Sequence, residues 1–283
     1  MPDLKDLEIG VMFWAGVDPV QTIRDIKAFG VRCGQMGIPG DLELMPGLDE
    51  AWRAALAAED FQITTVFCAY NGESYKDVPT VAATVGFVPP ATRQEREERT
   101  LAVSDFAAAI GVKSIACHIG FVPAPVEGQD NAEYTAVRNL VRRVCDHAAL
   151  NGQTFALETG QEPAPVLLKF LKDVERPNIG INFDPANMVL YGTGDPIEAL
   201  SVLAPQVISV HCKDGQWPPK DAPNALGRET TLGLGAVNIE LFIAKLKQVG
   251  YHGPLTVERE DPDPEQRVQD IVRGIELLRR VTA

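Results

Sequence analysis

The chain alternates strand-like and helix-like segments eight times, and this alternation constrains its fold more than any other feature. Apolar runs predict strands near 7–14, 31–37, 62–69, 112–118, 153–158, 179–184, 207–211 and 254–258. Apolar residues at helical spacing predict helices near 19–29, 48–59, 91–110, 131–151, 163–174, 196–204, 238–249 and 264–281. Eight such units in 283 residues match a (β/α)8 TIM barrel. An open doubly wound sheet is the alternative with the same alternation.

We expect the whole chain, residues 1–283, to form one domain, because no linker, low-complexity tract or repeat beyond the strand and helix unit is visible. Two connections that follow predicted strands are long, residues 70–91 and residues 212–237. Long loops at the strand-exit end of a barrel usually shape the substrate pocket. The alternative is that they brace neighbouring loops or form a subunit contact.

The chain is acidic, with a formal net charge of −13 and a pI of about 4.8. A field of this sign repels nucleic acid and anionic lipid, so we expect neither as a partner. The N-terminus has no basic region followed by an apolar core, and no apolar run approaches the length of a membrane span. These features predict a soluble, cytoplasmic protein, and they leave open whether it forms a homo-oligomer.

The five cysteines are odd in number and show no paired spacing. Cys33, Cys68, Cys117 and Cys212 fall in predicted strands, which favours buried, reduced thiols. Zinc binding through cysteine is the alternative, but the sequence contains no CxxC motif or Cys/His cluster.

Four potential metal ligands stand at the ends of four successive predicted strands: Glu158 in TFALE, Asp184 in IGINFD, His211 in VISVH and Glu258 in PLTVE. Small or polar residues share the parity of each ligand, whereas bulky apolar residues such as Ile208 and Val210 take the other parity. Because strand side chains alternate between two faces, all four ligands should share the face that a barrel turns inward. TIM barrels also carry their chemistry at the C-terminal ends of the strands.

Three carboxylates and one imidazole suit Mn²⁺, with Mg²⁺, Co²⁺ and Zn²⁺ as alternatives. A cation that holds two adjacent sugar oxygens stabilises the charge that develops as a proton leaves the neighbouring carbon, which gives an enediolate. Glu158 and Glu258 could then act as catalytic acid and base on opposite faces of that intermediate. The alternative is that each carboxylate only caps a helix or pairs with Arg259, Lys213 or Arg138.

The segments ALETG, INFDPANM, VISVHCKDG, LGLGAVN and LTVERE resemble the sugar phosphate isomerase/epimerase superfamily with the xylose-isomerase-like barrel, over essentially the whole chain. That superfamily includes ketose 3-epimerases, hydroxypyruvate isomerases, inosose dehydratases and endonuclease IV. The resemblance implies that Glu158, Asp184, His211 and Glu258 bind the metal and that the two glutamates form the acid/base pair. It also implies that Lys213, in the HCKDG motif, faces the substrate.

This chain differs from individual members of the superfamily in several features. Endonuclease IV needs a trinuclear zinc site with many histidines, whereas this chain has four histidines. The two-metal constellation and long C-terminal extension of xylose isomerases themselves are not found. Many ketose 3-epimerases have a histidine three residues after the strand-6 aspartate and an arginine six residues after the strand-7 histidine. Asn187 and Trp217 occupy these substrate-contact positions here. The resemblance therefore implies the metal site of the superfamily but not the substrate contacts of the epimerases.

Three further residues share the parity of the inward face. We expect His118 to contact the substrate or transfer a proton, with a structural hydrogen bond as the alternative. Trp14 could form an apolar wall against a sugar, or simply pack in the barrel, and Gln35 is a substrate-contact candidate of the same kind. The glycines fit turns better than a phosphate cradle, since none lies in a strand–GxGxxG–helix context: positions 192, 194, 233 and 235.

The sequence therefore predicts a metal-dependent isomerase or epimerase whose partner is a small-molecule sugar, a keto-sugar or related polyol derivative. A lyase that acts β to a ketone is the alternative enzyme, because the same enolate can expel a leaving group that His118 or Lys213 protonates. A non-catalytic sugar-binding barrel is the alternative from another class. The complete set of four ligands argues against it.

Overall fold

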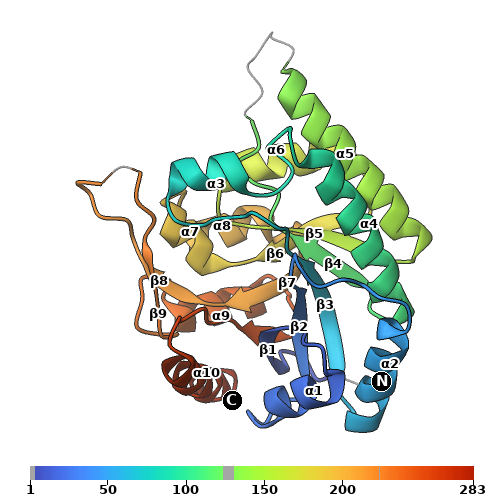
Figure 1. The fold of residues 1–283 in the computed structure, drawn as a ribbon. Helices are drawn as coiled ribbons and strands as arrows, with labels where there is room; N and C mark the ends of the chain where they lie inside the picture. The colour runs from blue at the N-terminus through green and yellow to red at the C-terminus, as the bar shows by residue number, and fades with distance from the viewer. Residues whose placement is uncertain (1–3, 124–130, 223) are drawn as a thin grey trace.

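Eight parallel strands close into a barrel with the order β1-β10-β7-β6-β5-β4-β3-β2, and helices surround it (Figure 1). The computed structural model describes residues 4–123, 131–222 and 224–283. The barrel strands are β1 (Ile9–Trp14), β2 (Cys33–Ile38), β3 (Gln62–Cys68), β4 (Ser114–Cys117), β5 (Thr154–Glu158), β6 (Ile179–Phe183), β7 (Val207–Cys212) and β10 (Leu255–Val257). This closure confirms the (β/α)8 barrel and rules out the open sheet.

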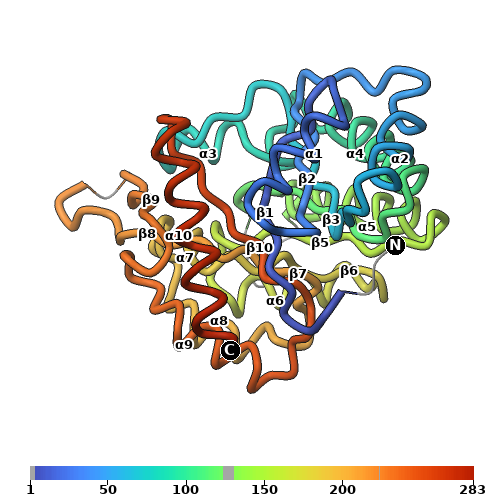
Figure 2. The backbone as a smooth tube through the Cα atoms, turned by 90° about the horizontal axis from the view of Figure 1, so that it is seen from below, coloured from blue at the N-terminus to red at the C-terminus, as the bar shows by residue number. Residues whose placement is uncertain are grey.

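The helices of the ring are α1 (Pro19–Lys27), α2 (Leu48–Glu59), α4 (Arg93–Ala109), α5 (Ala132–Leu150), α6 (Ala164–Val174), α8 (Pro196–Leu203), α9 (Ile239–Gln248) and α10 (Pro264–Thr282). A short 3-10 helix, η1 (Ala204–Gln206), leads into β7. Figure 2 shows the last helix, α10, beside the first strand, β1, and the pairing of β1 with β10 closes the barrel.

Aspartate–proline pairs start four of the helices. In each pair the aspartate side chain accepts a backbone N–H of the first turn, and the proline takes a position where no N–H is needed. The pairs are Asp18–Pro19 at α1, Asp184–Pro185 at α7 (Pro185–Tyr191), Asp195–Pro196 at α8 and Asp263–Pro264 at α10. Such caps are worth about 1 kcal/mol each. Asp184 is therefore a helix cap as well as a candidate ligand.

Apolar side chains on the outer face of the strands pack against the helices and form the main core. Phe155, Phe183 and Val210 are fully buried there, and burial of side chains of this size is worth roughly 1.5–3 kcal/mol each. A smaller cluster, Phe67, Ala116 and Ala156, lies separately from it. The larger core holds the strands in place around a partly polar interior.

The expected outward orientation of Ile208 is wrong. Ile208 packs against the smaller cluster, which includes Ala156 from the inward parity of β5. The pairing of β6 with β7 shifts at this point, from Ile181 opposite Val207 to Asn182 opposite Ser209. The extra residue breaks the simple alternation of faces, as expected at a β-bulge.

The two long connections contain structure that the sequence did not predict. The first holds α3 (Val78–Thr84), and the second holds an antiparallel hairpin of β8 (Asp214–Gln216) and β9 (Arg228–Thr230). They touch where Val78 N donates to Asn224 O over 3.1 Å. Residues 1–3, at the N-terminus considered above, and residue 223, in the second connection, lie outside the described residues.

All five cysteines are buried and unpaired, which confirms the prediction of reduced thiols. Among the residues that the structure describes, no helix combines the length and apolar character needed to cross a membrane.

Candidate metal centre and active site

The four predicted ligands converge at the strand-exit end of the barrel. Each offers one ligand atom, and these atoms lie within 4.8 Å of one another: Glu158, Asp184, His211 and Glu258. Glu158 and His211 lie at the ends of β5 and β7, whereas Asp184 and Glu258 directly follow β6 and β10. The barrel thus brings together four residues that span 100 positions of the sequence, from Glu158 to Glu258.

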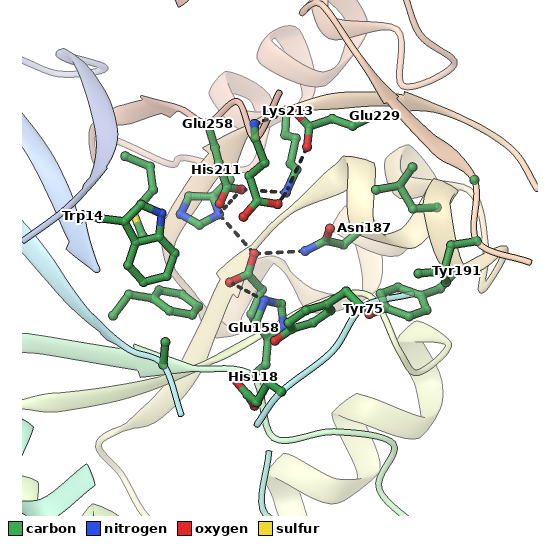
Figure 3. A pocket seen from close by; sticks show the side chains of 18 of the residues that line it. Trp14, Tyr75, His118, Glu158, Asn187, Tyr191, His211, Lys213, Glu229 and Glu258 are labelled. Atoms are coloured by element: carbon green, nitrogen blue, oxygen red, sulfur yellow. Dashed lines mark hydrogen bonds and ion pairs between the residues drawn. The ribbon is translucent and has the colours of Figure 1, made fainter. Parts of the chain in front are cut away.

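His211 lies at the centre of the cluster (Figure 3). Its Nδ1 atom is 3.0 Å from Glu158 Oε1, 3.0 Å from Glu258 Oε2 and 3.7 Å from Asp184 Oδ2. Both Asp184 and His211 are fully buried, and Glu158 is 3% exposed. Three carboxylates this close repel one another unless a positive charge or protons compensate.

One carboxylate oxygen of this cluster, Asp184 Oδ2, is buried and accepts no hydrogen bond. A buried charged oxygen without a donor costs more than about 1–3 kcal/mol. Asp184 uses its other oxygen to cap α7, by accepting Asn187 N over 3.0 Å, and Glu258 also pairs with Lys213 at 3.2 Å. Capping and ion pairing are thus both present: Lys213 reaches Glu258 Oε2, and Asp184 Oδ2 is still without a donor. The oxygen and imidazole donors fit a divalent cation.

The two glutamates have opposite electrostatic surroundings. Burial raises the pKa of Glu158 to about 8, although His211 opposes the shift. Burial would also raise the pKa of Glu258, but the neighbouring charges of His211 and Lys213 outweigh it and lower that pKa. Without a cation, a proton therefore resides on Glu158 rather than on Glu258. A bound cation would favour the charged form of both carboxylates.

A cavity of about 550 Å³ opens above the cluster. Its size falls in the range of small-molecule sites, roughly 300–1,000 Å³. Aromatic side chains form much of its wall: Trp14, Phe67, Tyr75 and Tyr191. Glu158, His211 and Glu258 border the same space, so a ligand in the cavity would meet the proposed metal centre directly.

Four of the six predicted substrate contacts line this cavity: His118, Lys213, Asn187 and Trp14 (Figure 3). His118 Nε2 lies 3.5 Å from Glu158 Oε2, and burial lowers the pKa of His118 to about 3, so its imidazole is neutral. Asn187 Nδ2 donates to Glu158 Oε1 over 3.0 Å. Both residues therefore border the cavity and contact Glu158, one of the two expected acid/base groups.

Lys213 is buried among three glutamates. Its Nζ atom is 3.0 Å from Glu260 Oε2, 3.2 Å from Glu258 Oε2 and 3.6 Å from Glu229 Oε2. Burial opposes the charge of Lys213, but these carboxylates raise its pKa well above the usual value. Lys213 is consequently a charged group that is already neutralised by its neighbours.

The other two predicted substrate contacts, Gln35 and Trp217, do not line the cavity. Gln35 is buried inside the barrel, where its Oε1 atom lies 3.1 Å from His211 Nε2. Trp217 directly follows β8 and is 44% exposed. The sequence did not predict the hairpin of β8 and β9. The position of Trp217 therefore could not be derived from its place six residues after His211 in the sequence.

Several residues that line the cavity were not identified from the sequence. Glu260 could have been found, because it lies two residues after Glu258. Glu229 and Tyr191 lie on the hairpin and on α7, which were not predicted. Glu73 and Tyr75 belong to the long connection after β3, which was expected to shape the pocket.

Asp214, the acidic residue of the HCKDG motif, fixes the loop that follows the hairpin. Its carboxylate accepts four backbone N–H groups, from Gly215, Gly233, Gly235 and Val237, over 2.9–3.1 Å. A Cβ atom at Gly235 would lie 2.0 Å from Asp214 Oδ1, and Gly233 has a φ of +88°. Glycines 233 and 235 therefore serve a turn, as predicted.

Comparison with known proteins agrees with this architecture. A family model described as "Xylose isomerase-like TIM barrel" matches residues 23–281. The crystal structure of a xylose isomerase domain protein from Planctomyces limnophilus is 40% identical, with a TM-score of 0.90 over 98% of this chain and 97% of that chain. A xylose isomerase-like TIM barrel protein from Mycobacterium smegmatis, in complex with magnesium, shares the fold at 19% identity, with a TM-score of 0.73 over 97% of this chain and 96% of that chain.

One curated relative is an epimerase. An L-ribulose 3-epimerase from Methylomonas sp. (strain DH-1) is 28% identical over 207 residues, which cover 67% of this chain and 65% of the epimerase. The matches span 65% or less of the length of the curated relatives.

Proposed function

Because the chain belongs to the xylose isomerase-like TIM barrel family, we propose that it is a divalent-metal-dependent isomerase or epimerase of a keto-sugar or related polyol derivative, acting through an enediolate. The observation that carries the proposal is the cluster of three carboxylates and one imidazole beneath a cavity of about 550 Å³, in which the buried Asp184 Oδ2 lacks a donor. The relationship to an L-ribulose 3-epimerase supports this class of reaction.

Glu158, Asp184, His211 and Glu258 would hold the cation, which we propose to be Mn²⁺, with Mg²⁺, Co²⁺ and Zn²⁺ as alternatives. Magnesium in the Mycobacterium smegmatis relative supports a divalent ion in this barrel. When bound, the cation would stabilise the negative charge that develops on the sugar oxygens beside it.

Proton transfer falls to Glu158 and Glu258. One carboxylate removes the proton from the carbon next to the carbonyl, and the other returns a proton to the enediolate. Both border the cavity, and their positions on β5 and beyond β10 allow an approach from two sides of a planar intermediate. Asn187 and His118 orient Glu158, while Lys213 holds Glu258.

The charges of the cavity favour an uncharged substrate. Glu73, Glu229 and Glu260 line it in addition to the proposed ligands. Among the described lining residues, Lys76 and Lys213 supply the positive side-chain charge, and Lys213 is already paired with three glutamates. A phosphate or carboxylate on the substrate would meet a negative field at close range. The aromatic wall suits the apolar face of a sugar ring.

A lyase reaction is the second candidate, and the position of His118 favours it. The neutral His118 imidazole borders the cavity beside Glu158, where it could protonate a leaving group expelled from the enolate. Both reactions begin with the same proton abstraction.

Deuterium exchange tests the proposed function. The Mn²⁺-loaded protein is incubated in D₂O with a panel of uncharged ketoses, keto-glycosides and phosphorylated ketoses, and NMR follows the carbon next to the carbonyl. We expect exchange with an uncharged substrate, and its loss by roughly 10²–10⁴ in Glu158→Gln and Glu258→Gln. Glu276→Gln, an exposed change on α10, is the matched control. Exchange that survives both site substitutions would assign the proton transfer to another group, His118 first.

A further inference from the structure

Gln35 contacts one ring nitrogen of His211, whereas the carboxylates contact the other, and Gln35 does not line the cavity. It belongs to β2, whereas His211 belongs to β7, and the two side chains meet inside the barrel. Gln35 is 1% exposed, and its Oε1 atom is 3.1 Å from His211 Nε2. A contact of this kind to a potential metal ligand can control which ring nitrogen carries the proton.

The neighbours of Gln35 determine which end of its amide faces His211. The Nε2 atom lies 3.1 Å from Asn182 Oδ1 and 3.4 Å from the backbone oxygen of Val210. A backbone carbonyl can only accept, so the nitrogen end of the amide must point toward Val210. Asn182 Oδ1 is in turn held as an acceptor, because the Ser209 hydroxyl donates to it over 2.6 Å. The amide oxygen of Gln35 is thereby left to face His211.

An amide oxygen also can only accept, which requires a proton on His211 Nε2. The lone pair of a neutral His211 then lies on Nδ1, the atom within 3.0–3.7 Å of the carboxylate oxygens of Glu158, Asp184 and Glu258. The opposite tautomer would direct an N–H group at those carboxylates and leave no lone pair for a cation. We propose that Gln35 is a positioning residue that holds His211 as the Nε2–H tautomer and presents Nδ1 to the metal.

This inference rests on the proposed metal centre, and the two can be tested separately. Whether the wild-type protein binds one divalent ion tests the metal centre. Which nitrogen of His211 is protonated in the loaded protein tests the role of Gln35. Ions bound elsewhere would overturn the proposed metal centre. An Nδ1–H tautomer in a protein that binds the ion would overturn only the proposed role of Gln35.

Three variants provide the comparison. Gln35→Leu removes both polar atoms at similar size. Gln35→Glu keeps an oxygen that can accept from His211 Nε2, so it should rescue the positioning. Ser114→Ala is the matched control, because Ser114 is also buried in the barrel and its hydroxyl has no hydrogen-bond partner.

Isothermal titration with Mg²⁺ gives the affinity, and NMR of ¹⁵N-histidine-labelled protein gives the tautomer. The chain has four histidines, so His211 can be assigned by substituting the others one at a time. We expect Gln35→Leu to weaken Mg²⁺ binding roughly 10–100-fold, the usual effect of removing a group that orients a ligand. Gln35→Glu and Ser114→Ala should stay within about threefold of wild type, and loaded wild type should show Nε2–H.

Wild-type affinity in a folded Gln35→Leu protein would overturn the proposal. So would equal weakening in Gln35→Leu and Gln35→Glu, because the loss would then follow from packing rather than from the acceptor. If Gln35→Leu does not fold, the tautomer of wild-type His211 still decides: Nδ1–H in the Mg²⁺-loaded protein contradicts the proposal.

Discussion

Asn187 donates its side-chain amide to Glu158 Oε1 over 3.0 Å, and its backbone N–H to Asp184 Oδ1 over the same distance. One residue of α7 thus contacts two of the four proposed ligands. Asn187 occupies a position where many ketose 3-epimerases have a histidine, and the sequence suggested a substrate contact there. The geometry adds a second role, the orientation of Glu158.

Asn187→Ala separates these two roles. The variant keeps the backbone donor to Asp184 but removes the donor to Glu158, so the carboxylate is free to rotate. We expect metal affinity to fall roughly tenfold without any substrate present, as for other groups that orient a ligand. Titration with Mn²⁺ measures this. A variant that binds Mn²⁺ normally but shows a raised KM would make Asn187 a substrate contact only.

Asp184→Asn and His211→Ala should remove tight divalent-ion binding and leave the barrel folded. Asp184→Asn replaces Oδ2, the oxygen that does not cap the helix, with an amide nitrogen. The remaining oxygen can still accept Asn187 N and cap α7. This variant should therefore unfold at nearly the wild-type temperature, whereas Asp184→Ala should lose about 1 kcal/mol more because the cap is gone. Metal analysis and thermal unfolding measure both effects. Wild-type metal content in either variant would exclude that residue as a ligand.

The sequence predicted all eight barrel strands and all four proposed ligands, because both depend on local patterns. Alternation of faces is a property of each strand, and a ligand at a strand end needs no knowledge of the neighbouring strand. Short elements were missed for the opposite reason. The helix α7 has seven residues and the strands β8 and β9 have three each, too few to show a periodic pattern.

The role of Gln35 could not be predicted, because its partners come from strands that are distant in the sequence. Its amide contacts Asn182 of β6 and His211 of β7, across the barrel interior. Register and barrel closure decide this contact, and neither is visible in a single strand. Ile208 shows the same limit, since its orientation depends on a shift in the pairing of β6 with β7.

Free ketohexoses such as fructose and tagatose should be poor substrates. Asn187 replaces the histidine of many ketose 3-epimerases and donates to Glu158, and Trp217, in place of their arginine, lies outside the cavity. Binding energy from remote contacts positions the reacting carbon, so their absence should lower kcat/KM for a small sugar. We expect values below roughly 10⁴ M⁻¹s⁻¹. Steady-state assays with Mn²⁺-loaded protein measure kcat/KM for these sugars. Higher values would contradict the prediction.

Glu162 should make the protein less stable as the pH rises. It lies in the loop after β5, is 6% exposed, and accepts Val122 N over 2.7 Å. Burial raises the pKa of Glu162 to about 8, whereas the ordinary value of a glutamate is about 4.5. Between these values the unfolded chain has released the proton while the folded protein still holds it. The contribution of Glu162 to the free energy of unfolding is therefore complete below about pH 4.5 and is lost as the pH rises to about 8.

Glu162→Gln removes this dependence and keeps an oxygen that can accept Val122 N. Because one pH unit corresponds to about 1.4 kcal/mol, the variant should gain on the order of 1–4 kcal/mol over wild type between about pH 5 and pH 8.5. Chemical denaturation with a chelator present measures the difference and removes any contribution of bound metal. Glu276→Gln changes the same charge on an exposed face of α10, so it should follow the wild-type pH profile. If the profiles of wild type and Glu162→Gln run parallel, Glu162 is ionised in the folded protein and the polar contacts in its loop outweigh its burial.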